Sequence, residues 1–289
     1  MFRAVAVTLE MIKFQHTVFA LPFAFLGAFT AAGGVPEART ILWILVAMVG
    51  ARSAAMAFNR LADERIDAAN PRTQSRALPA GLVSRSFVAA FTIASIALFL
   101  LAASMLNRLA FLLAPLALVI ILGYSLTKRF TSLSHLILGL ALAIAPAGAA
   151  IAVSGHFDPR ILPLALAVLF WTAGFDVLYS LQDVAFDHAM RLHSIPAAIG
   201  PHRALLVARL FHLMTIASLA LFGIAAGFGW LYFAGVAAAA ALLVWQHSIV
   251  SADDLSRIDA AFFTANGILS IVLFVFGACD ILIRSSGSP

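Results

Sequence analysis

Nine apolar runs, each about as long as a bilayer is thick, follow one another along this chain. An α-helix needs roughly 20 apolar residues to cross the hydrocarbon core of a membrane. The chain is 63% hydrophobic and 11% charged, whereas a soluble domain carries about 25% charged residues. We therefore predict an all-α, polytopic membrane protein with nine transmembrane helices. The predicted spans are residues 15–33, 40–58, 86–106, 108–125, 134–153, 160–180, 203–223, 228–250 and 261–283.

The basic residues indicate how these spans are oriented. A topology with a cytoplasmic N-terminus places twelve of the 18 Lys and Arg residues in cytoplasmic segments and four outside, with Arg52 and Arg209 inside spans. This bias follows the positive-inside rule and predicts a multi-pass protein of the cell inner membrane. Because the basic residues are scattered over short loops, the high pI does not indicate nucleic-acid binding. The lipid bilayer is the expected surrounding, and no obligate protein partner is implied.

Three polar side chains end the second apolar run at intervals of four residues: Asn59, Asp63 and Asp67. Residues at i, i+4 and i+8 drift little around a helix and so share one face. Two carboxylates and an amide oxygen suit Mg²⁺, which binds few protein oxygens and completes its shell with water and substrate phosphates. Arg72 and Arg76, in the turn that follows, are predicted to bind a diphosphate as bidentate donors.

Asp183 and Asp187 repeat this spacing 120 residues later, at the end of the sixth run. Carboxylates this close repel one another, and burial in an apolar bundle adds to the cost, so we expect them to bind a second Mg²⁺. Asp176, seven residues before Asp183, is predicted to share their helix face inside the membrane. It would orient a substrate hydroxyl or pair with Arg52, an intramembrane arginine on the face of the first motif.

With nine spans, both motifs fall on the cytoplasmic side, each followed by one of the two longest loops. Lys128 and Arg129 end the fourth run on the same side. They are either positive-inside anchors or the groups that neutralise a leaving diphosphate. A solvated helix end is the alternative for either acidic motif alone, but it does not account for two motifs matched in spacing and side.

The offset between the motifs also predicts an internal repeat. Residues of about 15–130 and 134–250 would form two four-helix halves, with a ninth helix added, inside a single domain of residues 1–289. The two motif helices would then face each other across a central cavity. His188 and His193 do not have the arrangement of a zinc site, and a ligand contact from the loop stays open for His193. The other six of the eight histidines are predicted to be interfacial or packing residues.

Three segments resemble the motifs of the UbiA superfamily of intramembrane aromatic prenyltransferases: NRLADERID (59–67), NPRTQSRALPAG (70–81) and DVAFDHAMRLHSIPAAIG (183–200). The opening MIKFQHTVFALPFAFLGAF (11–29) is similar to the bacterial 4-hydroxybenzoate polyprenyltransferase branch and its menaquinone-pathway relatives. The family often has Asp after the first Asn, where this chain has Arg60, which leaves one fewer acid for a metal. The resemblance implies a nine-helix bundle around a central cavity that opens laterally to lipid.

The resemblance also implies roles for the site residues. Two Mg²⁺ ions on a polyprenyl diphosphate would be held by two sets of side chains, Asn59 with Asp63 and Asp67, and Asp183 with Asp187. The diphosphate would be contacted by Arg72, Arg76, Lys128 and Arg129. Arg52 would bind the carboxylate of the acceptor, and Asp176 would orient the acceptor or act as a base.

The expected function is transfer of a polyprenyl group to an aromatic acceptor in quinone biosynthesis. We expect 4-hydroxybenzoate or a related aromatic acid as the acceptor. Within the same class, a dihydroxynaphthoate of menaquinone biosynthesis is the main alternative, and a haem or lipid headgroup is another. A secondary transporter of an anionic solute is a different class that also fits repeats and midplane charges. It is disfavoured because spans 7, 8 and 9 offer few polar groups and both acidic motifs open to one side.

Overall fold

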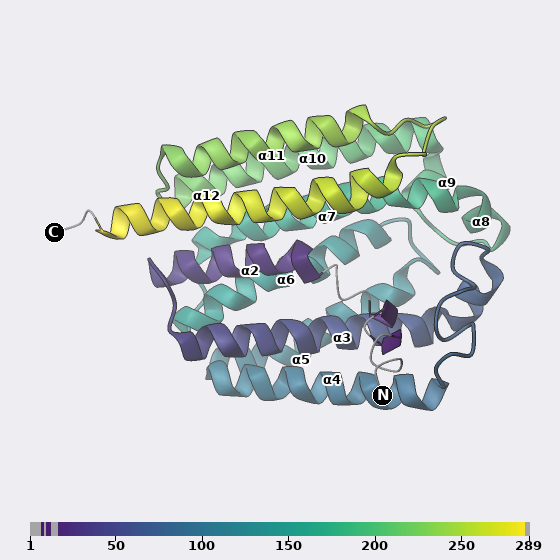
Figure 1. The fold of residues 1–289 in the computed structure, drawn as a ribbon, viewed down its shortest axis with the longest axis horizontal. Coiled ribbons are helices and arrows are strands. Elements are labelled where there is room, and N and C mark those ends of the chain that lie inside the picture. The colour runs from purple at the N-terminus through teal and green to yellow at the C-terminus, as the bar shows by residue number, and fades with distance from the viewer. Residues whose placement is uncertain (1–6, 9, 13–16, 287–289) are drawn as a thin grey trace.

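A computed structural model describes residues 7–8, 10–12 and 17–286 of the protein (Figure 1). Residues 15 and 16 of the first predicted span lie outside this part. The long helices are α2 (Thr17–Ala32), α3 (Ala38–Ala69), α4 (Arg85–Leu106), α5 (Arg108–Thr127), α6 (Ser134–Ser154), α7 (Leu162–Ser180), α10 (Pro201–Ala225), α11 (Trp230–Ser248) and α12 (Asn266–Ser286). The short helices are η2 (Pro159–Ile161), η3 (Leu181–Asp183), α8 (Val184–Ala189), α9 (Ile195–Ile199) and the π-helical η4 (Ala260–Ala265).

The predicted all-α membrane fold is confirmed. Eight helices of the described residues are long and apolar enough to cross a membrane, and α2 is a shorter apolar helix in the place of the first predicted span. Helices suit this setting because each one satisfies its own backbone hydrogen bonds where no water is available. The protein is therefore a multi-pass membrane protein.

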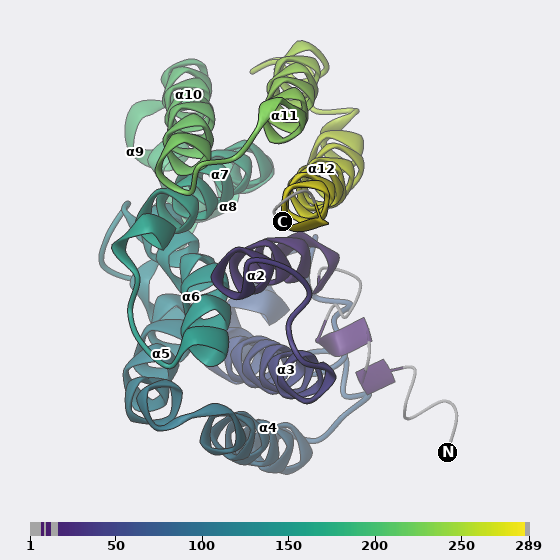
Figure 2. The ribbon, with the colours of Figure 1, turned by 90° about the vertical axis from the view of Figure 1, so that its left-hand side faces the viewer.

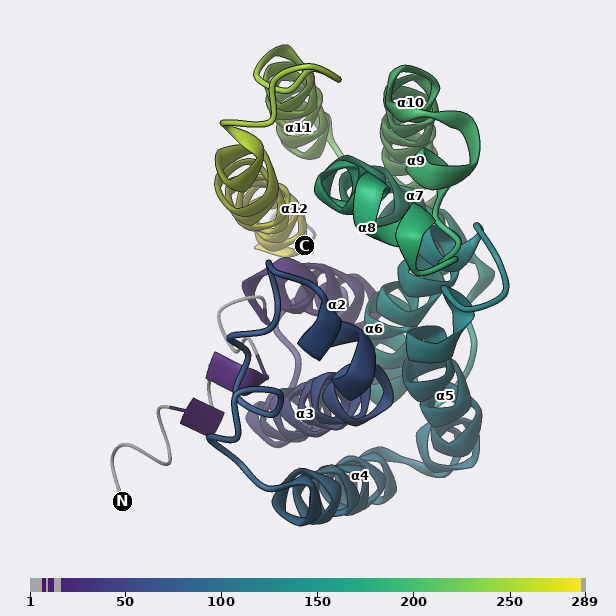
Figure 3. The same cartoon turned by 90° about the vertical axis from the view of Figure 1, so that its right-hand side faces the viewer.

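The helices lie in two groups that meet along α6 and α2. Figures 2 and 3 show α3, α4 and α5 on one side of α6 and α2, with α7, α10, α11 and α12 on the other. Helix α6 packs against α7, and α2 packs against α12. A buried aromatic cluster fills this junction, formed by Phe19, Phe23, Trp171, Phe175 and Phe262.

Helix boundaries differ from the apolar runs where polar residues continue a helix. The second run ends at residue 58, but α3 continues to Ala69 and carries the whole first motif. Hydropathy marks where contact with lipid ends, whereas the helix itself ends at Asn70, whose backbone N–H still bonds the carbonyl of Ile66. The single residue between the third and fourth predicted spans, Asn107, separates α4 from α5, and its side chain caps α5 by accepting from Ala110 N.

Close packing of α6 on α7 depends on Gly139. A Cβ built on Gly139 would lie 2.3 Å from the carbonyl oxygen of Leu169, a backbone atom of α7. We expect Gly139→Ala to lower the free energy of unfolding by about 1–3 kcal/mol, the usual cost of overpacking. Unfolding of the purified protein by a denaturing detergent would measure it. Gly148→Ala is the control, because it lies on the same helix with nothing within 4 Å of its Cβ position.

Candidate active site

The first motif lies at the end of α3, where two of its carboxylates face basic side chains. Asp63 Oδ2 accepts from Asn59 Nδ2 at 2.9 Å, and Asp63 Oδ1 lies 3.2 Å from Arg129 Nη2. Asp67 is buried and pairs with Arg76, whose Nη1 lies 2.6 Å from Asp67 Oδ1. Asn59 therefore stands behind Asp63 and supports its orientation.

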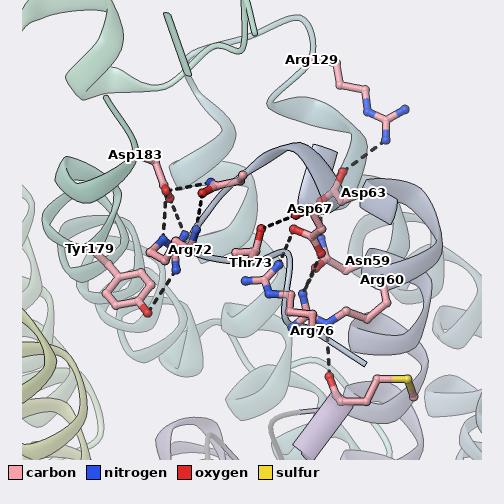
Figure 4. Close-up of polar contacts among 12 residues, drawn as sticks. Asn59, Arg60, Asp63, Asp67, Arg72, Thr73, Arg76, Arg129, Tyr179 and Asp183 are labelled. Carbon is pink, nitrogen blue, oxygen red and sulfur yellow. Dashed lines mark hydrogen bonds and ion pairs between the residues drawn. The ribbon is translucent and has the colours of Figure 1, made fainter. Parts of the chain in front are cut away.

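The turn after α3 joins the first motif to the second. Asn70 Nδ2 donates to Asp183 Oδ1 at 3.2 Å. Arg72 donates to both oxygens of the same carboxylate, from Nε to Oδ1 at 3.0 Å and from Nη2 to Oδ2 at 2.6 Å (Figure 4). Thr73 Oγ1 donates to the carbonyl of Asp67 at 3.1 Å. Two segments more than 100 residues apart thus meet through this turn.

Arg72 is held in its charged form. Desolvation by burial would lower the pKa of its guanidinium, but the hydrogen bonds and the negative charge of Asp183 raise that pKa above its ordinary value. The guanidinium also lies over the ring of Tyr179, 5.4 Å from the ring centroid. A bidentate, stacked arginine of this kind is preorganised for recognising phosphate.

The second motif is not one continuous helix face, so that prediction is wrong. Helix α7 ends at Ser180, and the 3₁₀ turn η3 leads into α8, which carries Asp187. Gln182 Nε2 donates to the carbonyl of Tyr179 at 3.1 Å, which in an α-helix would accept from the N–H of Asp183. The tighter 3₁₀ turn rotates α8 away from the face that carries Asp176.

Asp187 is fully buried and is held by residues from two other segments. Its Oδ2 accepts from Ser194 Oγ at 2.8 Å, and its Oδ1 lies 2.8 Å from Lys128 Nζ. Lys128 follows α5, so this ion pair brings the end of the fourth span to the second motif. Each of the four carboxylates predicted to bind metal therefore faces one of the four basic residues predicted to bind the diphosphate.

These side chains line one polar pocket of about 120 Å³. The predicted site residues that line it are Asp63, Asp67, Arg72, Arg76, Lys128, Arg129, Asp183 and Asp187. Its lining residues come from the end of α3, from α8 and from the turns beside them. The end of α3 and α8 lie at the end of the molecule opposite the C-terminal end of α12 (Figure 1). The expectation that both motifs open to one side is met by this arrangement.

The oxygen donors suit Mg²⁺ shared with a phosphorylated ligand. Among the described residues, no three His, Cys, Asp or Glu side chains lie close enough together to enclose a metal ion unaided. Asp67 Oδ2 is buried and accepts no hydrogen bond within the described part of the chain, since Arg60 Nη1 lies 3.6 Å away. Mg²⁺ requires few carboxylates when phosphate oxygens and water complete its octahedron.

An apolar cavity of about 600 Å³ lies between α3, α4, α5 and α6. It lies further from the C-terminal end of α3 than the polar pocket, that is, below the pocket. Along α5 its lining extends from Leu109 to Tyr124, which is about 22 Å of helix. Alanines make up much of the wall, and Phe157 lies at the end far from the pocket. Among its described lining residues, Arg52 and Tyr124 carry the polar side-chain atoms.

Arg52 and Asp176 lie apart from the polar pocket and do not pair with each other. Arg52 lines the apolar cavity, and its Nε is buried without a hydrogen-bond partner in the described part of the chain. Asp176 pairs instead with His135 of α6, whose Nδ1 lies 2.6 Å from Asp176 Oδ2. The predicted pair is wrong because α6 supplies a nearer partner for Asp176.

Sequence reasoning missed several residues that build this region. Asn70 follows the first motif and ends α3. The available sequence signal was the Asn-Pro pair that it forms with Pro71. His135 was assigned to packing, and no sequence spacing relates it to Asp176. Arg60 is buried, donates from Nε to the carbonyl of Met11 at 3.2 Å and faces Asp67. It therefore links Met11 to the end of α3 as a structural cation.

The fold and site together define a polytopic membrane enzyme with a charged pocket above an apolar cavity. The UbiA prenyltransferase family model matches residues 20–268. The chain therefore belongs to the UbiA prenyltransferase family, and it is an enzyme of that family.

Relatives of known name and structure agree with this assignment. The chain is 30% identical over 263 residues to a 4-hydroxybenzoate octaprenyltransferase of Nitrosomonas europaea, covering 91% of this chain and 89% of that one. It is 28% identical over 251 residues to the enzyme so named in Aliivibrio fischeri, covering 86% and 87%. A UbiA homologue from Aeropyrum pernix K1 has a similar structure, with a TM-score of 0.80, 32% identity and coverage of 93% and 98%.

The structure of a UbiA homologue from Archaeoglobus fulgidus bound to DMAPP and Mg²⁺ has the same fold. Its TM-score to this chain is 0.74 at 20% identity, covering 95% of this chain and 98% of that one. That homologue therefore binds a prenyl diphosphate together with Mg²⁺.

Proposed function

We propose that this enzyme transfers a polyprenyl group from a polyprenyl diphosphate to an aromatic acid, 4-hydroxybenzoate or a close relative. The observation that carries the proposal is the position of one charged pocket above one long apolar cavity. Met56 lines the cavity and Asp63 lines the pocket, about 10 Å apart along α3. The diphosphate head of a polyprenyl donor requires a charged pocket, and its isoprenoid tail requires an apolar cavity that adjoins this pocket.

The diphosphate binds in the polar pocket. The acidic side chains there hold Mg²⁺ against it, with Asp63 and Asp67 on one side and Asp183 and Asp187 on the other. When bound, Mg²⁺ neutralises the diphosphate and so makes it a better leaving group. The basic side chains move from the carboxylates to the phosphate oxygens and take up the charge that develops on them. These are Arg72, Arg76, Lys128 and Arg129.

The acceptor binds at the upper end of the apolar cavity with its carboxylate on Arg52. The unpartnered Nε of Arg52 supports this assignment, because a buried guanidinium without an anion is costly. The C–O bond of the donor breaks and its electron pair leaves with the diphosphate. A ring carbon of the acceptor forms the new C–C bond, and its proton passes to Asp176. The apolar walls exclude water, which would otherwise capture the allylic cation.

A dihydroxynaphthoate remains the second candidate acceptor. Its carboxylate would meet Arg52 in the same way, and the 28–30% identity to the named relatives supports the reaction class more strongly than the acceptor. The bias of Lys and Arg supports a cytoplasmic N-terminus and a polar pocket that opens to the cytoplasm at the inner membrane.

The test is a prenyl-transfer assay of the full chain in liposomes with Mg²⁺. Farnesyl or octaprenyl diphosphate is supplied with a panel of acceptors, and the prenylated product and released diphosphate are measured. We expect prenylation of an acceptor that carries a carboxylate, and none when EDTA is added. Binding of the donor with no product from any aromatic acid would refute the proposal. Product from a dihydroxynaphthoate alone would assign the second acceptor.

A further inference from the structure

His135 is a buried histidine whose two ring nitrogens each have a partner. Its Nε2 accepts from the backbone N–H of Ile195 at 3.2 Å, and its Nδ1 lies 2.6 Å from Asp176 Oδ2. A backbone N–H can only donate, so Nε2 must present its lone pair. The proton of the neutral ring is therefore on Nδ1, where it is donated to Asp176 Oδ2.

The segment that holds His135 also holds two residues of the polar pocket. His193 N donates to the carbonyl of Lys128 at 2.7 Å, and Ser194 Oγ donates to Asp187 at 2.8 Å. Ile195, the next residue, donates to His135. Three consecutive residues thus connect the end of α5, the second motif and the start of α6.

The His135–Asp176 pair lies between the levels of the two cavities. Leu138, one turn further along α6 than His135, lines the apolar cavity. Asp183, seven residues after Asp176 and in η3 just beyond the end of α7, lines the polar pocket. Asp176 remains 28% exposed at its side chain while His135 is buried behind it. In the proposed binding mode, in which the donor spans both cavities, the bond between its head and its tail lies at this level.

We propose that His135 is a positioning residue for Asp176 and that it ties this carboxylate to the 193–195 segment. By donating to Oδ2, it fixes the carboxylate rotamer and leaves Oδ1 to receive the ring proton of the acceptor. The proposal rests on the proposed prenyl transfer and adds a specific dependence of the chemical step on α6.

The test is a double-mutant cycle of His135→Leu and Asp176→Asn in the prenyl-transfer assay. We expect His135→Leu to lower kcat by about 10–100-fold, the usual effect of removing the group that orients a functional side chain. The KM for the diphosphate should change much less than kcat, because Lys128 and Asp187 keep their own hydrogen bonds to His193 and Ser194. In the Asp176→Asn background, His135→Leu should lower kcat by less than about threefold, because the two residues act as one unit.

His135→Gln is the conservative variant, because an amide can both donate to Asp176 and accept from Ile195 N. We expect it to retain kcat within a few-fold of the wild type, with an unchanged unfolding temperature. Equal losses in the Gln and Leu variants, additive effects in the cycle, or full activity of His135→Leu would each overturn the proposal. Wild-type protein without any prenyl transfer would instead refute the proposed function, so the two failures are distinguishable.

Discussion

Asp183→Ala is expected to abolish prenyl transfer, with kcat falling by about 1000-fold or more. Asp183 receives three hydrogen bonds, one from Asn70 and two from Arg72. Under the proposed function, its loss removes one carboxylate of the proposed Mg²⁺ site and releases Arg72, which is proposed to bind the diphosphate. Removing a single group that stabilises transition-state charge already costs about 100–1000-fold, and this change disturbs two such groups. Steady-state assays at saturating donor would measure the loss, and calorimetry would follow Mg²⁺-dependent donor binding.

Glu64→Gln is the matched control for Asp183→Ala. Glu64 lies on α3 between Asp63 and Asp67, does not line the polar pocket, and faces Arg85 at 3.6 Å. We expect Glu64→Gln to keep wild-type activity and donor binding. Asp183→Ala with normal turnover and the fold retained would remove Asp183 from the site. Normal Mg²⁺-dependent donor binding without turnover would limit its role to the chemical step.

The fold could be predicted from hydropathy because the membrane imposes one simple requirement. A run of about 20 apolar residues in lipid must be helical, so the number and order of the long helices followed from sequence. Local ends were harder, because nothing in the apolar pattern predicts that α3 continues to Ala69. At the break after Ser180, the Gln182 side chain donates to the carbonyl of Tyr179. This side-chain hydrogen bond competes with the backbone hydrogen bond that would continue the α-helix. The internal repeat stays a prediction.

The members of the candidate site could be predicted better than their contacts. Topology alone puts both acidic motifs and Lys128 on one side, and the structure gathers them in one pocket. The pairing of each basic side chain with its carboxylate depends on helix packing and on the turn at Asn70. Neither of these can be predicted from the spacing of residues in the sequence. Arg52 illustrates the limit. Its place within a span followed from sequence, but the predicted pairing with Asp176 did not hold, because His135 is the partner of Asp176.

Arg52→Leu is expected to lower kcat/KM for 4-hydroxybenzoate by about 100-fold or more. Each hydrogen bond to a charged group contributes about 1.5–3 kcal/mol, and an arginine can make two to a carboxylate. The KM for the donor should change little, because Arg52 lies outside the polar pocket proposed for the diphosphate and leucine leaves an apolar wall beside the tail. Leucine also replaces a buried, unpartnered Nε, so the unfolding temperature should stay the same or rise. Activity and stability would then move in opposite directions, which misfolding cannot produce.

The methyl ester of 4-hydroxybenzoate separates recognition of the carboxylate from any other role of Arg52. Wild-type enzyme should prefer the acid strongly, whereas Arg52→Leu should use acid and ester equally poorly, because the charge no longer has a partner. Arg209→Leu is the control: Arg209 lies on α10, is exposed and lines neither cavity, so its loss should leave the acceptor preference intact. If Arg52→Leu kept the preference for the acid and raised the KM of the donor, Arg52 would act on the diphosphate. The acceptor carboxylate would then need a different cation. That cation would have to lie outside the apolar cavity, because Arg52 is the charged side chain among the described residues that line it.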